Sequence, residues 1–191
     1  MKRNLKDCRW LIVAFFLALP LAQNLALGRA QEGKIVPYVP TPQEVVDRML
    51  ALAEVKKGDV VYDLGSGDGR IVITAAKKFG VKAIGFEIDP ERIKESRENI
   101  KKAGVGQLVE IRQQDIRTVD LSPASVLTMY LLPEVNLMIR PNIWQQMKPG
   151  SRVVSHDFDM GDWKPLKTEA IKDGSSWEHT LYLWHVEARK R

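Results

Sequence analysis

Two hydrophobic patterns alternate along the chain from about residue 42 onward. Short apolar runs alternate with longer segments in which apolar residues recur every three or four positions, as on one face of a helix. The runs predict strands at 60–62, 82–87, 109–115, 125–130, 152–156 and 179–187. The longer segments predict helices at 71–76, from 90 to about 104, and at about 134–147. Successive strand–helix units predict an α/β domain with a parallel sheet and right-handed crossovers.

One more helix is expected ahead of the first strand. Thr41-Pro42-Gln43-Glu44 matches a capping box with proline at the first helical position. The apolar residues that follow have helical spacing, which is typical of a face packed on the core. They are Val45, Val46, Met49, Leu50 and Ala53.

A glycine-rich turn follows the first predicted strand and leads into a helix. Its sequence is Asp63-Leu64-Gly65-Ser66-Gly67-Asp68-Gly69-Arg70. A dinucleotide-binding turn has glycines in the order G-x-G-x-x-G and receives a pyrophosphate. Here the glycines alternate, and a carboxylate at Asp63 would repel that dianion. Asp63 and Asp68 would instead attract an ammonium or a sulfonium, so the turn favours a cationic nucleoside over NAD.

Two further acids stand at predicted strand ends. Glu87 ends the second strand, 24 residues after Asp63, where an acid can accept hydrogen bonds from ribose hydroxyls. Asp115 ends the third strand and can accept from an adenine amino group, while the N–H of Ile116 meets a ring nitrogen. The alternative is structural: Glu87 and Asp89 cap the helix at Pro90, and Asp115 caps a turn.

These residues give the chain a resemblance to class I S-adenosylmethionine-dependent methyltransferases over roughly residues 36–188. Within that superfamily it resembles the protein-lysine methyltransferases that modify the ATP synthase c subunit and the adenine nucleotide translocase. The finer matches are Pro37-Tyr38-Val39-Pro40-Thr41-Pro42, Tyr130-Leu131-Leu132-Pro133 and Ser155-His156-Asp157-Phe158. The resemblance implies a single Rossmann-like methyltransferase domain. Its sheet is expected to be seven-stranded and mostly parallel, with helices on both faces and an antiparallel last strand.

The resemblance also implies S-adenosyl-L-methionine as cofactor and a lysine of a protein as substrate. The cofactor-binding residues it implies are Tyr38, Thr41, Asp63, Gly65, Ser66, Gly67, Asp68, Gly69, Glu87, Ile88, Asp115, Ile116 and Tyr130. Nothing in the chain resembles the Asn-Pro-Pro-Tyr tetrad with which many methyltransferases hold a planar amide or base. That absence is consistent with a lysine substrate.

The catalytic candidates are Tyr130, which ends the fourth predicted strand, and Asp157, which with His156 ends the fifth. Ligands bind at this edge of such sheets, so Tyr130 is expected to line the methyl-transfer channel and Asp157 to orient the substrate amine. A lysine must lose its proton before it can attack, since its free pKa is about 10.4. The alternative for Tyr130 is packing, and His156 is expected to be a structural hydrogen bonder. Adjacent strand residues point to opposite faces, so Ser155-His156-Asp157 is no hydrolase triad. With only three histidines, no metal site is expected.

Charge argues against nucleic acid as the main partner. The chain has a formal net charge of +5, but residues 1–30 hold five basic residues and one acid. The remainder has 24 basic and 23 acidic residues, so residues 31–191, the expected methyltransferase domain, are almost neutral. We expect the protein to act as a monomer on a protein substrate. A substrate at a membrane is one of the alternatives.

The first thirty residues predict a signal peptide or a membrane anchor. Basic residues precede an apolar segment at 10–22, and small residues near Ala30 suggest cleavage there. Thirteen apolar residues are short for a membrane span, which needs about 20. Either alternative predicts an exported or membrane-associated protein, in conflict with a cofactor made in the cytosol. A misassigned start site is the third alternative. The single cysteine, Cys8, lies in this segment, so no disulfide is expected within the body.

Three functions therefore remain open at this point. The leading one is a protein-lysine methyltransferase. The second is a methyltransferase for a small molecule, because the compact body has no added substrate domain. The third is a non-catalytic module that holds an adenosyl ligand.

Overall fold

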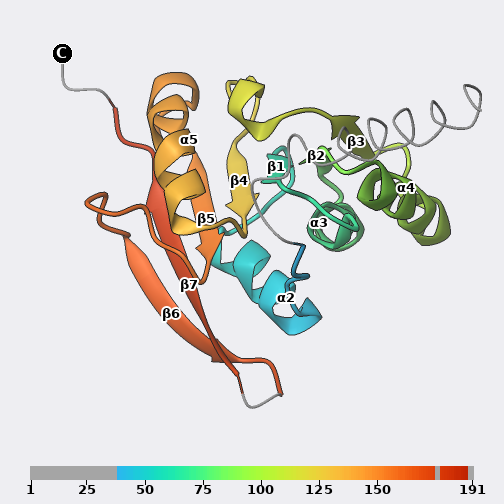
Figure 1. Cartoon of the computed structure of the whole chain (residues 1–191), viewed down its shortest axis with the longest axis horizontal. Helices are drawn as coiled ribbons and strands as arrows, with labels where there is room; N and C mark the ends of the chain where they lie inside the picture. Colours follow the sequence, from blue (N-terminus) through green and yellow to red (C-terminus); the bar gives the residue numbers. More distant parts are fainter. Residues whose placement is uncertain (1–37, 175–176, 189–191) are drawn as a thin grey trace, which may run out of the picture. The chain divides into compact units, whose positions relative to one another are not determined.

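A computed structural model describes residues 38–174 and 177–188, which form a seven-stranded sheet with helices on both faces (Figure 1). The strand order is β3-β2-β1-β4-β5-β7-β6. The strands are β1 Val60–Leu64, β2 Lys82–Glu87, β3 Val109–Gln113, β4 Val126–Met129, β5 Arg152–His156, β6 Lys167–Lys172 and β7 Glu178–His185.

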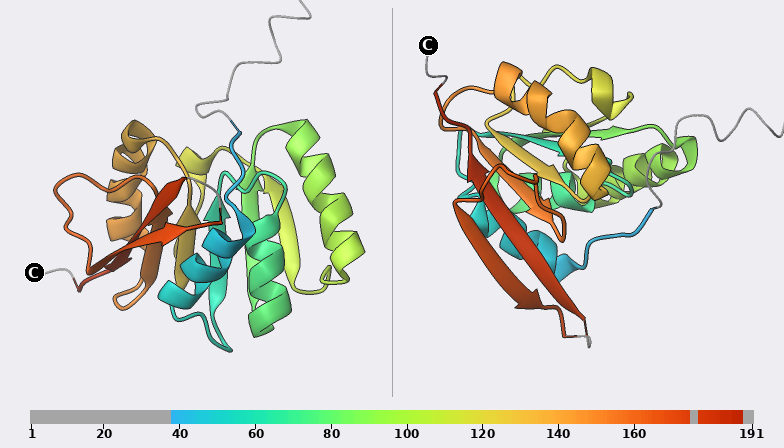
Figure 2. Two further views of the ribbon diagram at one scale, coloured as in Figure 1. Left: turned by 90° about the horizontal axis from the view of Figure 1, so that it is seen from below. Right: turned by 60° about the vertical axis from the view of Figure 1, so that its left-hand side comes forward.

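The helices divide between the two faces of the sheet (Figures 1 and 2). The helices are α2 Gln43–Leu52, α3 Arg70–Phe79, α4 Pro90–Ala103 and α5 Pro133–Gln146, with a short 3-10 helix, η1, at Ile116–Thr118. Apolar side chains of α2, α3 and α4 form one core with the sheet, and those of α5 and η1 form a second core. The predicted three-layer α/β domain is confirmed.

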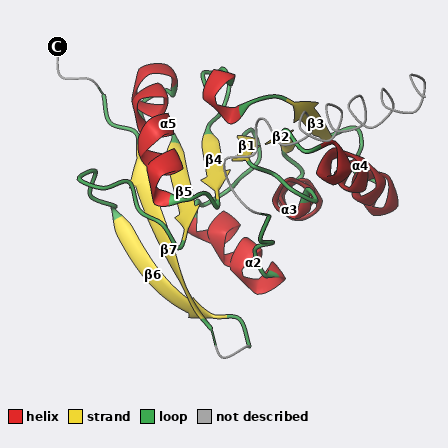
Figure 3. Cartoon of the chain, viewed as in Figure 1, coloured by secondary structure: helices red, strands yellow, loops and turns green. Residues whose placement is uncertain are grey.

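Strand directions also agree with the expectation. Strands β1 to β5 are mutually parallel, and β7 runs antiparallel to both β5 and β6 (Figure 3). The hydrophobic pattern did not predict β6, because its sequence Lys-Thr-Glu-Ala-Ile-Lys is mostly polar and lies at the sheet edge. The predicted third strand is shorter than expected: it ends at Gln113, and Asp115 begins η1 instead.

The register of the parallel strands aligns the carboxyl ends of β2, β1, β4 and β5 at one edge of the sheet. Leu64 of β1 pairs with Phe86 of β2 on one side and with Met129 of β4 on the other, and Met129 pairs with Ser155 of β5. The chain order reverses between β1 and β4, and parallel α/β sheets bind ligands at the carboxyl edge beside such a reversal. The glycine turn and the predicted catalytic residues therefore belong to the same edge.

The capping box predicted at residues 41–44 is wrong. Pro42 is the N-cap of α2 and no side chain caps the helix. Thr41 points elsewhere: its hydroxyl oxygen lies 3.1 Å from Nδ1 of His156. The start of α4 is as expected, because Asp89 accepts a hydrogen bond from the N–H of Glu91 at 3.0 Å.

A buried ion pair joins the amino ends of β1 and β5, opposite the carboxyl ends that form the site. Arg152 of β5 contacts the carboxylate of Asp59 in front of β1. Asp59 also accepts from the Ser125 hydroxyl at 2.7 Å and from the Lys56 N–H at 2.9 Å. Burial alone would raise the pKa of Asp59, but the hydrogen bonds from Arg152, Lys56 and Ser125 hold that pKa below its usual value.

The expectation of an exported or membrane-associated protein is corrected. Among residues 38–174 and 177–188, no helix is long and apolar enough to cross a bilayer. Over those residues α4 and α5 reach 14 residues each, against the roughly 20 that a spanning helix needs. The predicted leader at residues 1–30 lies outside the described residues.

Candidate functional site

The glycine turn closes tightly on the neighbouring strand. The N–H groups of Gly65 and Ser66 both donate to the carbonyl of Phe86 in β2, at 2.9 and 3.0 Å. Gly65, Gly67 and Gly69 have φ angles of 75°, 54° and 82°, a region that side chains with a Cβ avoid. The alternating glycines therefore supply three left-handed positions, which turn the chain from β1 into α3.

Tyr38 covers this turn. A Cβ atom built on Gly67 would lie 2.5 Å from Cε2 of the Tyr38 ring, so the ring lies directly against the glycine. The guanidinium of Arg92, from α4, stands 4.8 Å from the centre of the same ring. Tyr38 therefore lies against the glycine turn, and its predicted contact with the cofactor stays a prediction.

Glu87 is held above the turn by backbone donors. Its Oε2 accepts from the N–H of Gly67 at 2.9 Å, and its Oε1 accepts from Ile88 at 2.8 Å and Asp89 at 3.0 Å. The alternative, that Glu87 merely caps α4, does not describe this arrangement, because Asp89 performs the capping. These bonds fix the carboxylate beside the turn, and its predicted contact with ribose stays a prediction.

Asp63 is a buried acid that favours a cation nearby. Its side chain is buried, and its Oδ1 accepts from the Thr128 hydroxyl at 2.8 Å. Burial, together with the negative charges of Glu87 and Asp68, raises the pKa of Asp63 to about 7, although the hydrogen bond from Thr128 opposes the rise. A positively charged group beside Asp63 would restore the ionised form. The site therefore fits an ammonium or sulfonium nucleoside such as S-adenosylmethionine and disfavours a pyrophosphate.

Asp68 differs from Asp63 in being neutralised by the chain itself. Arg70 Nη2 lies 2.7 Å from Asp68 Oδ2, and Arg70 Nη1 donates to the carbonyl of Thr41 at 2.7 Å. Burial alone would raise the pKa of Asp68, but the hydrogen bonds from Arg70 hold that pKa below its usual value. Asp68 thus holds Arg70 in place, and Arg70 in turn bonds to the segment before α2. The predicted contact of Asp68 with the cofactor stays a prediction.

Three other predicted cofactor residues, Ser66, Asp115 and Ile116, differ in their contacts within the chain. The Ser66 hydroxyl is buried, makes no hydrogen bond within the described residues, and would lie 2.3 Å from a Cβ on Gly85. Asp115 caps η1 through the Arg117 N–H at 2.9 Å and pairs with the Arg117 side chain. The predicted turn cap at Asp115 is therefore present, and Ile116, next to it, is buried. The adenine contacts expected of Asp115 and Ile116 stay predictions.

The two catalytic candidates lie close together. Tyr130 directly follows β4, and its ring centre stands 3.9 Å from that of His156. Burial raises the pKa of the Tyr130 hydroxyl, and the nearby Asp157 carboxylate, to which it is hydrogen-bonded, raises it further. Asp157 itself is held by Thr180, whose N–H donates to Oδ1 at 2.8 Å.

His156 and Asp157 were expected to point to opposite faces of the sheet, as adjacent strand residues do, and this expectation is wrong. β5 ends at His156, and Asp157 has a left-handed φ of 60°. This turn brings Asp157 Oδ2 to 3.2 Å from Nε2 of the fully buried His156. No hydrolase triad results, because Ser155 Oγ instead accepts a hydrogen bond from Asn136 at 3.2 Å.

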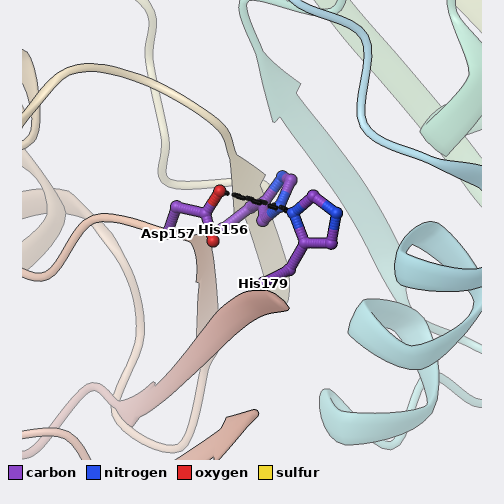
Figure 4. Close-up of side chains that lie close together, drawn as sticks. All are labelled: His156, Asp157 and His179. Carbon is purple, nitrogen blue, oxygen red and sulfur yellow. Dashed lines mark hydrogen bonds and ion pairs between the residues drawn. The ribbon is translucent and has the colours of Figure 1, made fainter. Parts of the chain in front are cut away.

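A second histidine, missed by the sequence reasoning, joins this group (Figure 4). Nδ1 of His179, at the start of β7, lies 2.9 Å from Nε2 of His156 and 3.5 Å from Asp157 Oδ2. Its Nε2 faces Asp173 at 3.2 Å. The sequence signal was the histidine that opens the alternating terminal strand, but only the pairing of His156 with Leu181 across β5 and β7 brings it here.

Comparison with known proteins identifies the family. Residues 63–167 match the family described as the ANTKMT methyltransferase domain. A protein-lysine N-methyltransferase of the archaeon Saccharolobus islandicus is 50% identical over 156 residues, which cover 81% of this chain and 96% of that protein. The chain belongs to the ANTKMT methyltransferase family. The predicted family, enzyme class and fold are thereby confirmed.

One further relative and one solved structure are also similar to this chain. The human lysine N-methyltransferase of the ATP synthase c subunit is 30% identical over 68% of this chain, and the match spans only 55% of the human protein. A crystal structure of an RNA methyltransferase from Salinibacter ruber, in complex with S-adenosyl-L-homocysteine, is 52% identical with a TM-score of 0.75. It covers 80% of this chain and 97% of that one. This neighbour, which holds the demethylated cofactor, confirms S-adenosylmethionine as the predicted cofactor.

Proposed function

We propose that this chain transfers a methyl group from S-adenosylmethionine to the side-chain amine of a lysine in a protein. The observation that carries the proposal is the single sheet edge that holds both halves of the site. Asp63 and Glu87, which favour a cationic nucleoside, lie at the ends of β1 and β2, while Tyr130 and Asp157 follow β4 and β5. The predicted reaction agrees with the lysine methyltransferases among the relatives.

The chain's own residues supply binding and orientation. The cofactor brings an activated methyl on a sulfonium, so the protein has to align donor and acceptor and exclude water. In this proposal Asp63 and Glu87 hold the cofactor, and Tyr38 covers it. The carboxylate of Asp157 receives the lysine ammonium, orients it and accepts one proton from it, which leaves a neutral amine to attack the methyl carbon as the carbon–sulfur bond breaks. The Tyr130 ring lines the channel. The proposal takes the monomer as the acting unit, as the sequence resemblance led us to expect.

RNA is the alternative that needs testing, because the Salinibacter ruber neighbour bears the name of an RNA methyltransferase. Two features favour protein instead. Residues 31–191 have almost no net charge, whereas a protein that binds RNA backbone presents clustered basic charge. The segment Tyr130-Leu131-Leu132-Pro133 after β4 also has no asparagine amide that could hydrogen-bond to a planar base edge.

The experiment compares substrate classes in one assay. Purified protein is incubated with methyl-labelled S-adenosylmethionine and, separately, with the proteins, the total RNA and the metabolites of its host. The proposal predicts label in protein bands, and mass spectrometry of their digests should place the added methyl groups on lysine. Label confined to RNA or to small molecules would overturn the lysine assignment, and cofactor binding without transfer to any fraction would indicate a non-catalytic module.

A further inference from the structure

Three potential metal ligands converge where β5 and β7 meet. His156 Nε2, His179 Nδ1 and Asp157 Oδ2 lie 2.9, 3.2 and 3.5 Å from one another, pair by pair. Figure 4 shows the two rings side by side with the carboxylate turned toward them. Such a set of two imidazoles and one carboxylate is a known donor set for zinc.

The spacing suits one ion bound by all three atoms. A point equidistant from the three atoms lies about 1.9 Å from each, just under the zinc–nitrogen and zinc–oxygen distances of about 2.0–2.2 Å. An ion slightly out of their plane would reach all three at bonding distance and keep a fourth position open, which is the geometry of a three-ligand zinc site.

The outer nitrogens of both rings have partners that suit metal binding. His156 Nδ1 lies 3.1 Å from the Thr41 hydroxyl, within hydrogen-bond distance. His179 Nε2 lies 3.2 Å from the carboxylate of Asp173, a close contact that lacks hydrogen-bond geometry. An oxygen beside each outer nitrogen favours the proton there and leaves the inner lone pair free for a metal ion.

The surroundings also allow an ion to enter. His156 is fully buried, but the side chains of His179 and Asp157 are 14% and 26% exposed, so one side of the group is open to solvent. Mg²⁺ and Ca²⁺ prefer sites made of oxygen atoms alone, whereas imidazole nitrogens favour zinc-type ions.

We propose that His156, His179 and Asp157 form a site for a zinc-type divalent ion, and that the bound ion inhibits methyl transfer. The first half depends only on the three side chains. The second half rests on the proposed function, in which Asp157 receives the lysine ammonium. One carboxylate oxygen cannot hold the metal and the ammonium together, so the ion and the protein substrate compete, whereas the cofactor, bound at Asp63 and Glu87, does not.

Calorimetric titration of tag-free, chelator-treated protein with zinc chloride tests the site without any need for activity. We expect one ion per chain with micromolar affinity and no heat from magnesium chloride. His179→Asn should weaken zinc binding by about tenfold or more, and Asp173→Asn, which leaves the ligands in place, by about 10–100-fold. His185→Ala is the matched control: it removes the remaining one of the three histidines, an exposed residue at the far end of β7, and should leave the affinity unchanged.

The outcomes separate the site from the function. Three outcomes would each overturn the site: absence of saturable zinc binding, native zinc affinity in folded His179→Asn and Asp173→Asn proteins, or loss of binding in His185→Ala. Inhibition is then measured as the ratio of transfer rates with and without zinc in each variant. Zinc should slow the native protein, competitively with the protein substrate and not with S-adenosylmethionine, and His179→Asn should be insensitive. Zinc that binds without slowing transfer would overturn the inhibitory role alone.

Discussion

The hydroxyl oxygen of Thr41 lies 3.1 Å from Nδ1 of His156, although the two residues are 115 positions apart in the sequence. The carbonyl of the same Thr41 accepts from Arg70, which also pairs with Asp68 in the glycine turn. Thr41 therefore joins the cofactor half of the site to the half that holds Tyr130 and Asp157. A disturbance at the segment before α2 is expected to reach both.

Replacing Thr41 tests this link. Thr41→Val keeps the shape of the side chain but leaves the buried Nδ1 of His156 without its hydroxyl partner, at a cost of about 1–3 kcal/mol. The free energy of unfolding, measured with urea, should fall by about that amount. Thr41→Ser retains the hydroxyl and serves as the control, with a loss of less than about 1 kcal/mol. Equal losses in the two variants would show that the hydrogen bond does not contribute to the free energy of unfolding.

Asp63 should make cofactor binding depend on pH. Its pKa is raised from 3.8 to about 7, so near pH 5.5 the unliganded site is mostly neutral and attracts a cation poorly. Titration calorimetry should find S-adenosylmethionine bound about tenfold more tightly at about pH 8 than at about pH 5.5. Asp63→Asn cannot ionise and should bind weakly at both pH values. A native affinity that does not change with pH would contradict this role.

The same shift has the opposite effect on the stability of the unliganded protein. Because the folded-state pKa of Asp63 is raised, the folded chain holds a proton that the unfolded chain has already released between about pH 4 and 7. The stability contribution of this proton is full below about pH 4 and is lost as the pH rises through about 7. Urea unfolding across this window should show a decline in the native protein that is smaller in Asp63→Asn.

Gly67 should tolerate no Cβ, because of Tyr38. Gly67→Ala would place its methyl group 2.5 Å from the Tyr38 ring and would keep a left-handed φ of 54°. The displaced Tyr38 ring should lose its contact with the cofactor. A loss of about 1.4 kcal/mol or more would weaken cofactor binding at least about tenfold. Gly80→Ala is matched to it, with a φ of 64° and no atom within 4 Å. This control should lose stability but retain its affinity.

A second substitution separates the clash from the backbone strain. If the ring of Tyr38 is the obstacle, Tyr38→Ala in the Gly67→Ala protein should cause little further loss, whereas Tyr38→Ala alone should weaken binding. Strictly additive effects in this double-mutant cycle would refute a contact between the two residues.

The ion pair of Asp59 and Arg152 should carry stability without affecting the site. Asp59→Asn leaves the guanidinium of Arg152 buried beside a neutral amide, and breaking a buried pair in this way costs about 3–5 kcal/mol. Urea unfolding should show that loss, while cofactor affinity in the folded protein stays unchanged, because the pair lies at the other edge of the sheet. Glu110→Gln, which breaks the exposed pair with Arg112, should cost less than about 1 kcal/mol.

The sequence was sufficient to predict the α/β fold and the glycine-rich turn with its neighbouring acids. Strand β1, the glycine turn and Glu87 are local features: an apolar run, three left-handed glycines, and an acid at a strand end. Such features depend on neighbours in the sequence, so periodicity and spacing predict them. The polar edge strand β6 was missed because, unlike these local features, it depends on pairing with β7 and not on a hydrophobic pattern of its own.

The other half of the site depends on contacts between distant segments. Asp157 was expected to face away from His156, and only its left-handed φ of 60° brings the two together. His179 reaches this group through the antiparallel pairing of β7 with β5. Thr41, predicted to cap α2, bonds to His156 instead. Each of these outcomes results from tertiary packing that local propensity does not encode.

The most direct test of the account is the rate of a single round of methyl transfer in the Asp157→Asn protein at saturating cofactor. The amide preserves the size of the side chain but removes the charge that receives the lysine ammonium. If Asp157 orients the amine and draws off its proton, the rate should fall about 10²–10⁴-fold, while S-adenosylmethionine affinity stays within about threefold of the native value. A folded Asp157→Asn protein whose rate falls by less than about threefold would contradict the proposed centre of methyl transfer.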